Sequence, residues 1–181
     1  MRKVLFILGQ LSDMDAEWMA RVGIKKTIPN GTTIIHEGVK SPNLYILLQG
    51  VLQIEDSQLG PIAKLGIGEV VGEMSFVDNA PPSASVIAHG DCIVLQLSHE
   101  ALEKRMTSDL GFGMRLYKAL CFFLADRLRG TVRRFGYGEG GSLDSDEILT
   151  DELDENLLDT VSIAGERFDR MLKQLASAKS E

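Results

Sequence analysis

Hydrophobic and polar residues follow two different periods along this chain, and the change of period marks its regions. Between residues 24 and 97, short apolar runs alternate with turns, and glycine stands at nearly every reversal. The runs are Ile24–Ile28, Thr32–His36, Leu44–Leu48, Val51–Glu55, Ile62–Leu65, Glu69–Val71, Ser83–Ala88 and Cys92–Leu97. Closely spaced strands of this kind predict a mainly β fold, a β-roll or double-stranded jelly roll, rather than a parallel α/β sheet.

Helical spacing flanks the β region on both sides. The segment from Ser12 to Arg21 starts with a capping residue followed by acids, which predicts a short helix. After the last strand, His99–Met106 indicates a second short helix, and Leu110 to about Arg134 indicates a long one. Residues 119–125 of the long helix are apolar on nearly every side, so more than one face needs a cover. A second copy of the chain and the chain's own tail are the two candidates for that cover.

Composition changes sharply after the long helix. A glycine-rich stretch over residues 135–142 ends the helix and leads into a strongly acidic segment. We therefore predict a folded domain over residues 1–136, a flexible acidic linker over 137–150 and an amphipathic tail helix over 151–178. The apolar side of this tail helix consists of Leu153, Leu157, Val161, Ala164, Phe168, Leu172 and Leu175.

The formal net charge of −7 belongs almost entirely to the tail. Residues 1–138 contain 15 Lys and Arg against 14 Asp and Glu, whereas residues 139–181 contain 4 against 12. Nucleic acid repels such a tail, so we predict a protein partner for it and no DNA partner. No stretch approaches the roughly 20 apolar residues that a membrane-spanning helix needs, and acids follow the short apolar run at the N-terminus. These features predict a cytoplasmic protein without a membrane span.

Motifs for catalysis or metal binding are missing from the sequence. There is no Gly-x-Ser-x-Gly elbow, P-loop or zinc-binding HExxH, and the three histidines have unrelated spacings. Cys92 and Cys121 both lie within apolar runs, which predicts two buried thiols. We predict no catalytic residues, no metal and no enzymatic activity.

One segment, residues 72–86, has a layout suited to holding a ligand. It reads as a glycine-ended strand, one helical turn, an Asp-Asn turn and a strand of small residues. Such a layout presents backbone N–H groups and a helix N-terminus to an anion, with the carboxylate of Glu73 beside them. The candidate ligand-binding residues are Gly72, Glu73, Ser83, Ala84 and Ser85.

This segment closely resembles the phosphate-binding cassette of cyclic nucleotide-binding domains, of the catabolite activator and protein kinase A regulatory subunit type. The hairpin at Leu44–Gly50 and the approach at Leu65–Glu73 match the same family, so the resemblance extends over about residues 11–135. It implies that Gly72 and Glu73 are the glycine and the ribose-binding glutamate of that family. The alternative for Glu73 is a carboxylate that only holds the loop together.

Position 82 departs from the family, because Pro82 stands where the family has its phosphate-gripping arginine. A hydrogen bond to a charged group is worth roughly 1.5–3 kcal/mol, so losing it weakens binding about 10- to 100-fold. The resemblance therefore implies a cyclic nucleotide that binds weakly or not at all. Two further interpretations are a different small ligand and a cassette that has become a rigid structural loop.

The long helix carries two further features. In the family its equivalent often mediates dimerisation, which implies a homodimer here. The residues of this dimer helix would be Tyr117, Leu120, Cys121, Leu124 and Leu128. Four arginines at positions 127–134 favour the helix dipole, or offer a docking surface for the acidic tail or for an acidic partner.

Two functions remain open from the sequence. The first is a non-catalytic regulator, in which a ligand at the cassette shifts the long helix and the tail passes that shift to a protein partner. The second is a ligand-free domain that acts as an assembly or protein-interaction module. The acidic segment after the long helix does not match the helix-turn-helix module of the family's transcription factors, which excludes that role.

Overall fold

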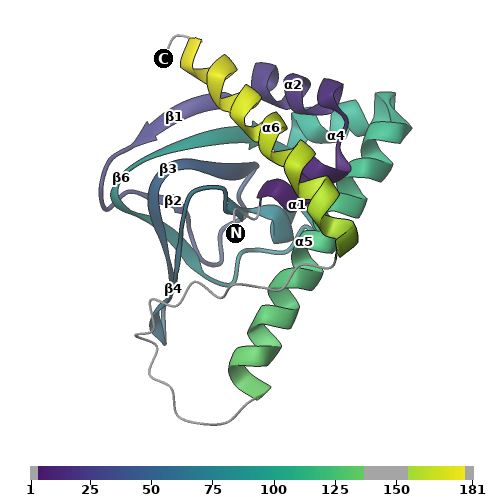
Figure 1. The fold of residues 1–181 in the computed structure, drawn as a ribbon. Helices are drawn as coiled ribbons and strands as arrows, with labels where there is room; N and C mark the ends of the chain where they lie inside the picture. The colour runs from purple at the N-terminus through teal and green to yellow at the C-terminus, as the bar shows by residue number, and fades with distance from the viewer. Residues whose placement is uncertain (1–3, 137–154, 178–181) are drawn as a thin grey trace.

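An antiparallel β-roll forms the centre of the molecule, and helices cover one side of it (Figure 1). The computed structural model describes residues 4–136 and 155–177. The strands are β1 Ile24–Ile28, β2 Thr33–Ile35, β3 Asn43–Asp56, β4 Gly60–Leu65, β5 Val70–Val71 and β6 Ser85–Ser98. They run in the order β1-β6-β3-β4, with β2 paired to β6 and β5 paired to β3. The prediction of a mainly β roll with flanking helices is confirmed.

Two of the strands are longer than the sequence pattern predicted. The runs at 44–48 and 51–55 belong to one strand, β3, and the last two runs likewise merge into β6. Gly50 has φ +92° and lies in β3 where the pairing with β6 shifts register. A Cβ at Gly50 would lie 2.7 Å from the carbonyl oxygen of Asp91. Glycine therefore permits a bulge that bends the paired strands without ending them.

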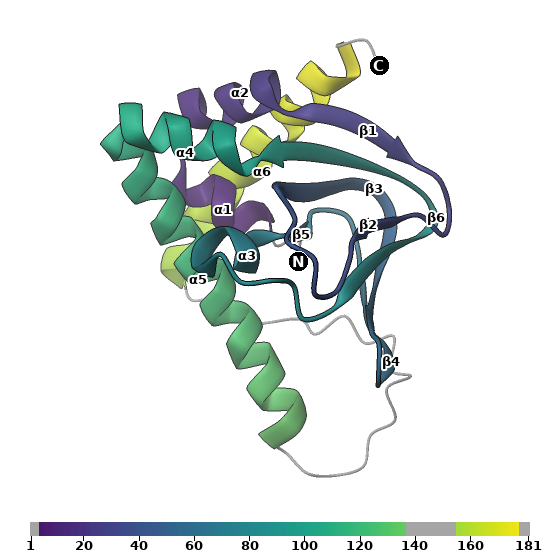
Figure 2. The same cartoon turned by 180° about the vertical axis from the view of Figure 1, so that it is seen from behind.

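Helices form the rest of the described structure. They are α1 Val4–Gln10, α2 Asp13–Val22, α3 Glu73–Asp78, α4 His99–Ser108, α5 Leu110–Gly136 and α6 Glu155–Ser177. The helix α2 begins with a capping box, in which the Ser12 hydroxyl accepts from the Asp15 N–H and the Asp15 carboxylate accepts from the Ser12 N–H. The short helix α3 lies beside α5, next to β5 (Figure 2).

The helix α1 has no counterpart among the predicted elements. It packs between α5 and α6, and its side chains Val4, Ile7 and Leu8 are buried. Its seven residues are too few to show a helical period, and the first five are all apolar because helices cover α1 on two sides. The second face of α5 is thus covered by α1 of the same chain, and α6 in turn covers α1.

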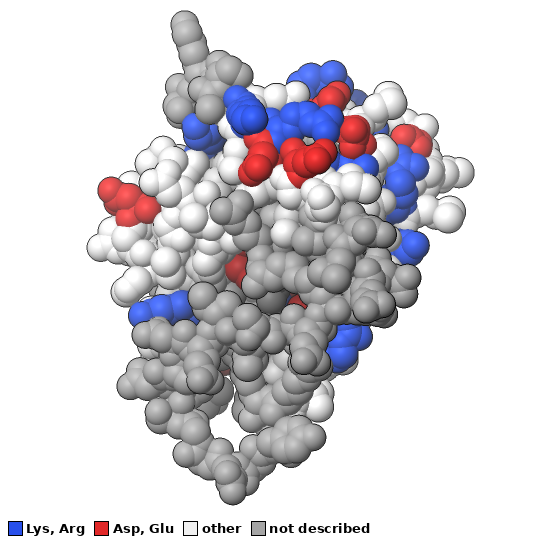
Figure 3. Space-filling model, in the orientation of Figure 1, with Lys and Arg blue, Asp and Glu red and all other residues white. Residues whose placement is uncertain are grey.

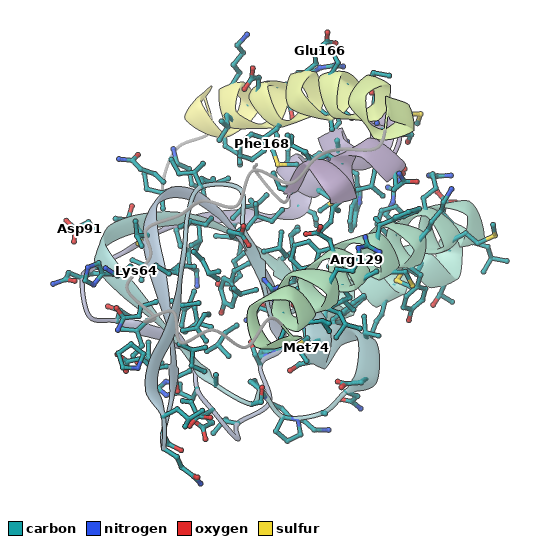
Figure 4. All side chains as sticks on the ribbon, turned by 60° about the horizontal axis from the view of Figure 1, so that its bottom comes forward. Lys64, Met74, Asp91, Arg129, Glu166 and Phe168 are labelled. Atoms are coloured by element: carbon teal, nitrogen blue, oxygen red, sulfur yellow. The ribbon has the colours of Figure 1, made fainter. Side chains whose placement is uncertain are left out.

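The apolar side of α6 faces the domain. Phe168 points from α6 toward the N-terminal helices, whereas Glu166 points away (Figure 4). Buried residues on the same side are Ala164, Phe168, Met171 and Leu175. The predicted linker over residues 137–150 lies outside the described residues. No helix in the described part of the chain is long and apolar enough to cross a membrane.

Two apolar cores share the sheet between them. One fills the inside of the roll and includes Leu47, Leu52, Val86, Ala88, Cys92 and Val94. The other lies between the roll and the helices and includes Ile46, Leu95, Leu102, Phe112, Phe123 and Phe168. Because successive side chains of a strand point to opposite faces, β3 and β6 contribute to both cores and hold the cassette against the helices.

Candidate ligand-binding site

The cassette begins at a position that requires glycine. Gly72 has φ +88° and precedes the first residue of α3. A Cβ there would lie 2.5 Å from the carbonyl oxygen of Asn43, so both the backbone conformation and the space exclude a side chain. The tight turn carries the chain directly from β5 into α3 and places Glu73 at the first position of the helix.

Glu73 is 1% exposed and accepts a hydrogen bond from Nη1 of Arg127 on α5. Nη2 of Arg127 donates to the carbonyl oxygen of Val70 at 3.0 Å and lies 3.8 Å from the carboxylate of Glu69. The guanidinium also stands over the ring of Phe123, 4.7 Å from its centre. The cassette glutamate is therefore fastened to the long helix by a side chain 54 residues further along the sequence.

These contacts change the interpretation of Arg127. The sequence grouped it with the cations that end the long helix, as a partner of the helix dipole or of the acidic tail. In the structure it reaches back into the cassette, because a buried carboxylate needs a charged partner. Arg129 is exposed, and the side chains of Arg133 and Arg134 lie outside what the structure describes.

Two carboxylates of the cassette meet at one side chain of the long helix. The guanidinium of Arg127 contacts both Glu73 and Glu69, and Pro82 adds no cation to the cassette. A carboxylate repels a phosphate, whereas it can accept hydrogen bonds from hydroxyl groups. The carboxylate of Glu73 is therefore chemically suited to a hydroxyl-bearing ligand.

The second wall of the cassette is tied to the turn after β2. Gly38 N–H donates to the carbonyl oxygen of Pro82 at 2.8 Å, and Glu37 N–H donates to the hydroxyl of Ser85 at 3.0 Å. Ser83 is exposed and Ala84 is half-buried. The structure thus brings Gly72 and Glu73 together with Arg127, whereas Ser85 takes part in a separate set of contacts.

Ser85 also borders an open hollow of about 420 Å³. Its lining includes the carboxyl residues Glu37, Glu55 and Asp56, together with Thr33 and Ser57. The carboxylate of Glu37 is held by the N–H and the hydroxyl of Ser57, both at 2.8 Å. Three acids beside Ser85 disfavour a phosphate at this position. The role of Ser85 in ligand binding stays a prediction.

The face of α3 that meets the helices is aromatic. Phe76 is buried, stacks on Tyr117 of α5 at 6.4 Å and meets His99 of α4 edge-on at 5.1 Å. Burial lowers the pKa of His99, while Glu103 and the carbonyl of Asn43 act in the opposite direction. In contrast, Met74 of the same helix is half-exposed beside α5 (Figure 4).

The outer face of α5 carries an exposed apolar stripe. Tyr117 is 46% exposed and Leu128 is 64% exposed, and Cys121 between them is exposed as well. The prediction of a buried thiol at Cys121 is therefore wrong, because this residue lies on the outward side. Leu120 is 1% exposed and belongs to the domain's own core, so it cannot be a dimer contact.

This apolar stripe extends further toward the start of the helix than sequence reasoning placed it. Leu110 and Met114 are both strongly exposed. The stripe residues are Leu110, Met114, Tyr117, Cys121, Leu124 and Leu128, of which Leu124 is partly buried against the core of the domain. Their alternating spacings of four and three residues are those of a coiled-coil seam.

A second buried carboxylate was not recognised from the sequence. Asp15 of α2 accepts from Nε and Nη2 of Arg115 at 2.7 and 3.1 Å and from Nη2 of Arg105 at 3.2 Å. Arg105 is enclosed by the rings of Trp18 and Phe112, each 4.7 Å away. Burial alone would raise the pKa of Asp15, but Arg115 and the Ser12 N–H and hydroxyl lower it from 3.8 to about 2.

Comparison with known proteins agrees with this geometry. Residues 25–109 match the family model of the cyclic nucleotide-binding domain. The predicted resemblance to that family is confirmed over this part of the chain.

Two relatives illustrate the match. The cAMP-dependent protein kinase regulatory subunit of Candida albicans is 28% identical over 102 residues, which cover 56% of this chain and 22% of that protein. The cyclic AMP receptor protein of Thermus thermophilus is 34% identical over 80 residues, which cover 42% of this chain and 37% of that protein. The chain thus spans well under half the length of these curated relatives.

Solved structures share the fold. A cyclic nucleotide-binding domain from Methylobacillus flagellatus superimposes with a TM-score of 0.66 at 24% identity, covering 77% of this chain and 85% of that one. The regulatory subunit of a cAMP-independent protein kinase A from Trypanosoma brucei gives 0.55 at 22% identity, covering 70% and 41%. At these identities the likeness concerns the fold alone.

Proposed function

We propose that this protein is a non-catalytic regulator whose cassette binds a ribose-bearing, nucleotide-type ligand through Glu73. The observation that supports this most directly is the contact between Glu73 and Arg127, which links the ligand-binding glutamate to the long helix. A ribose hydroxyl that donates to Glu73 would compete with the Arg127 guanidinium for the same carboxylate. Binding would then alter the hold of the cassette on α5.

The ligand contributes little through its phosphate in this proposal. Pro82 removes both a guanidinium and a backbone N–H from the wall that would face the phosphate. Recognition then rests on hydroxyl groups and on the fit of the base, so the affinity for cyclic AMP is low. The predicted contacts of Ser83, Ala84 and Ser85 with a ligand belong to the same proposal.

Calorimetric titration tests the ligand. Cyclic AMP, cyclic GMP and cyclic dinucleotides would be titrated into the wild-type chain, with adenosine as a probe that has the ribose but no phosphate. We expect weak heats, and Pro82→Arg should tighten cyclic AMP binding about 10- to 100-fold. The matched control is Pro81→Arg, which adds the same charge one residue away. An absence of heat and of any melting shift with every probe, in wild type and in Pro82→Arg, would refute the proposal.

We assign the exposed stripe of α5 to a homodimer. The seam runs for more than two heptads, is self-complementary and exposes large side chains that water contacts poorly. Leu128→Glu should convert the dimer to a monomer in sedimentation equilibrium. Ile163→Glu, which changes an equally apolar exposed residue on α6, should leave the mass unchanged. A monomeric wild type at micromolar concentration would contradict the assignment.

A second candidate function follows from Pro82. Without the arginine, and with Arg127 already bound to Glu73, the cassette would be a fixed structural element of an assembly module. The same titration separates the two functions, because this module gives no heat in the wild type or in Pro82→Arg.

A further inference from the structure

The first turn of α1 is attached to the loop that leads into the cassette. The N–H of Val4 donates to the carbonyl oxygen of Gly68, and the N–H of Gly68 donates to the carbonyl oxygen of Leu47 at 2.8 Å. The next two residues of this loop, Glu69 and Val70, are partners of Arg127. The loop at 68–70 is therefore held by α1 from one side and by α5 from the other.

The far end of α1 is attached to the tail helix. Nη1 of Arg167 donates to the carbonyl oxygen of Leu8 at 2.8 Å, and its Nε donates to Asp13 at 2.6 Å. Arg170 adds a contact of 3.3 Å to the same carboxylate. The side chain of Arg167 is only 14% exposed. Cationic and acidic side chains lie next to one another along this upper edge of the molecule (Figure 3).

The body of α1 is packed on both sides. Its residues Val4, Ile7 and Leu8 are buried in the core that also contains Phe123 of α5 and Phe168 of α6. A seven-residue helix is about 10 Å long and does not compress, and a close-packed interior transmits displacement rather than absorbing it. A shift of the loop at 68–70 therefore moves α1 as a unit against the face on which α6 rests.

We propose that α1 couples the cassette to the tail helix, so that the state of the loop at 68–70 sets how firmly α6 docks. When the loop holds Val4, α1 presents its Leu8 carbonyl and its apolar side to α6. When the loop releases Val4, α6 loosens and uncovers the apolar side that contains Ala164 and Phe168. The input rests on the proposed ligand function, but the coupling itself is a property of the ligand-free chain.

Two substitutions of Val4 distinguish coupling through α1 from a simple loss of packing, because the two explanations predict opposite orders of hydrogen-exchange rate. Val4→Pro removes the N–H that bonds to Gly68 and keeps most of the side-chain volume, at a helix position that tolerates proline. Val4→Ala keeps the N–H and removes more of the buried side chain. Hydrogen exchange measured over residues 162–175 should be about three- to tenfold faster in Val4→Pro than in Val4→Ala. Equal exchange, or faster exchange in Val4→Ala, would overturn the coupling.

A second pair approaches the loop from α5, should the proline variant fail to fold. Arg127→Met removes the contacts that this side chain makes with Glu69, Glu73 and the Val70 carbonyl. Arg129→Met makes the same change at an exposed position two residues later. We expect exchange over residues 162–175 to rise at least about threefold in Arg127→Met relative to Arg129→Met. Identical protection in the two variants would refute the coupling. A coupling found without any nucleotide heat would leave this inference standing and remove the proposed ligand.

Discussion

Two buried carboxylates, Asp15 and Glu73, are each held by an arginine from the long helix, but within different sets of donors. Asp15 accepts hydrogen bonds from two guanidiniums, those of Arg105 and Arg115, and from the N–H of Ser12. Glu73 accepts from Arg127, whose guanidinium also bonds to the carbonyl oxygen of Val70. The two clusters lie in the same domain and use the same helix, so the difference between them is a difference of composition rather than of scaffold.

The two sets of contacts predict different roles for the two carboxylates. Asp15 receives donors on both oxygens, and its pKa of about 2 reflects how strongly they favour the charged form. Such a cluster ties α2, α4 and α5 together and has little need of a further donor. Glu73 stands at the first position of α3 in the cassette, where its carboxylate can accept a hydrogen bond from a hydroxyl group. In line with the proposed function, we expect substitution of Glu73 to affect ligand binding and substitution of Asp15 to affect stability.

The largest expected effect is on stability at the Asp15 cluster. Asp15→Asn leaves Arg105 and Arg115 facing a neutral amide and should lower the free energy of unfolding by about 3 kcal/mol. Urea denaturation measures the change. The control is Asp13→Asn on the same helix, where the carboxylate is half-exposed and the loss should be much smaller. Similar losses in the two variants would remove the distinction.

The fall in the free energy of unfolding at acidic pH tests the same cluster without a change in the shape of its side chains. The folded-state pKa of Asp15 is lowered from 3.8 to about 2, so its contribution is complete above pH 4 and is lost as pH falls toward 2. Over that range we expect the wild type to lose about 2 kcal/mol more than Asp15→Asn does. Urea titrations at several acidic pH values provide the data. Parallel curves for the two proteins would show that Asp15 titrates normally.

At the cassette, we expect a substitution to change ligand binding more than it changes stability. Glu73→Gln should cost only about 1 kcal/mol of stability, because Arg127 keeps Glu69 and the Val70 carbonyl as partners. In a Pro82→Arg background, the same change should weaken cyclic AMP binding about tenfold, as calorimetry would show. Asp15→Asn in that background should bind as before. Equal weakening of cyclic AMP binding by Glu73→Gln and by Asp15→Asn would show that the effect on binding is not specific to Glu73.

The smallest expected effect on stability comes from replacing the guanidinium of Arg115, which contacts Asp15, by an ammonium group. Arg115→Lys replaces two hydrogen bonds by one point contact at a side chain that is 37% exposed. The loss should be about 0.5 kcal/mol in urea denaturation, with Lys118→Arg on the same helix as the control. A loss as large as that of Asp15→Asn would mean that fork geometry, rather than charge, dominates the cluster.

Local patterns along the sequence predicted most of the fold. Strand positions followed from apolar runs between glycine turns, and β1 was placed correctly from Ile24 to Ile28. The glycine-ended strand and the helical turn of the cassette were predicted correctly because both follow from residues that are adjacent in sequence. The joining of runs into β3 was missed, since Gly50 can equally end a strand or bulge it.

What the sequence could not predict are contacts between distant residues. Asp15 looked like an ordinary acid in the first turn of a helix, and its arginine partners lie 90 and 100 residues away. Arg127 lies near the end of the long helix, where a cation is expected to interact with the helix dipole. Helical spacing predicts on which face of a helix a residue lies, but it does not predict which distant residue it contacts. Cys121 had apolar neighbours on all sides, and its exposure depends on which face α1 covers.

The packing of α1 against α6 also has a consequence for how the chain is made. Residues 4–10 leave the ribosome well over a hundred residues before residues 155–177, which cover them in the folded protein. At a rate of synthesis of about 5–20 residues per second, α1 is made roughly 7–30 seconds before α6, the helix that covers it. During that interval a nascent chain exposes the apolar side chains of α1 that α6 later covers. Its yield in cells should therefore depend on chaperone supply and on the speed of translation through the acidic segment.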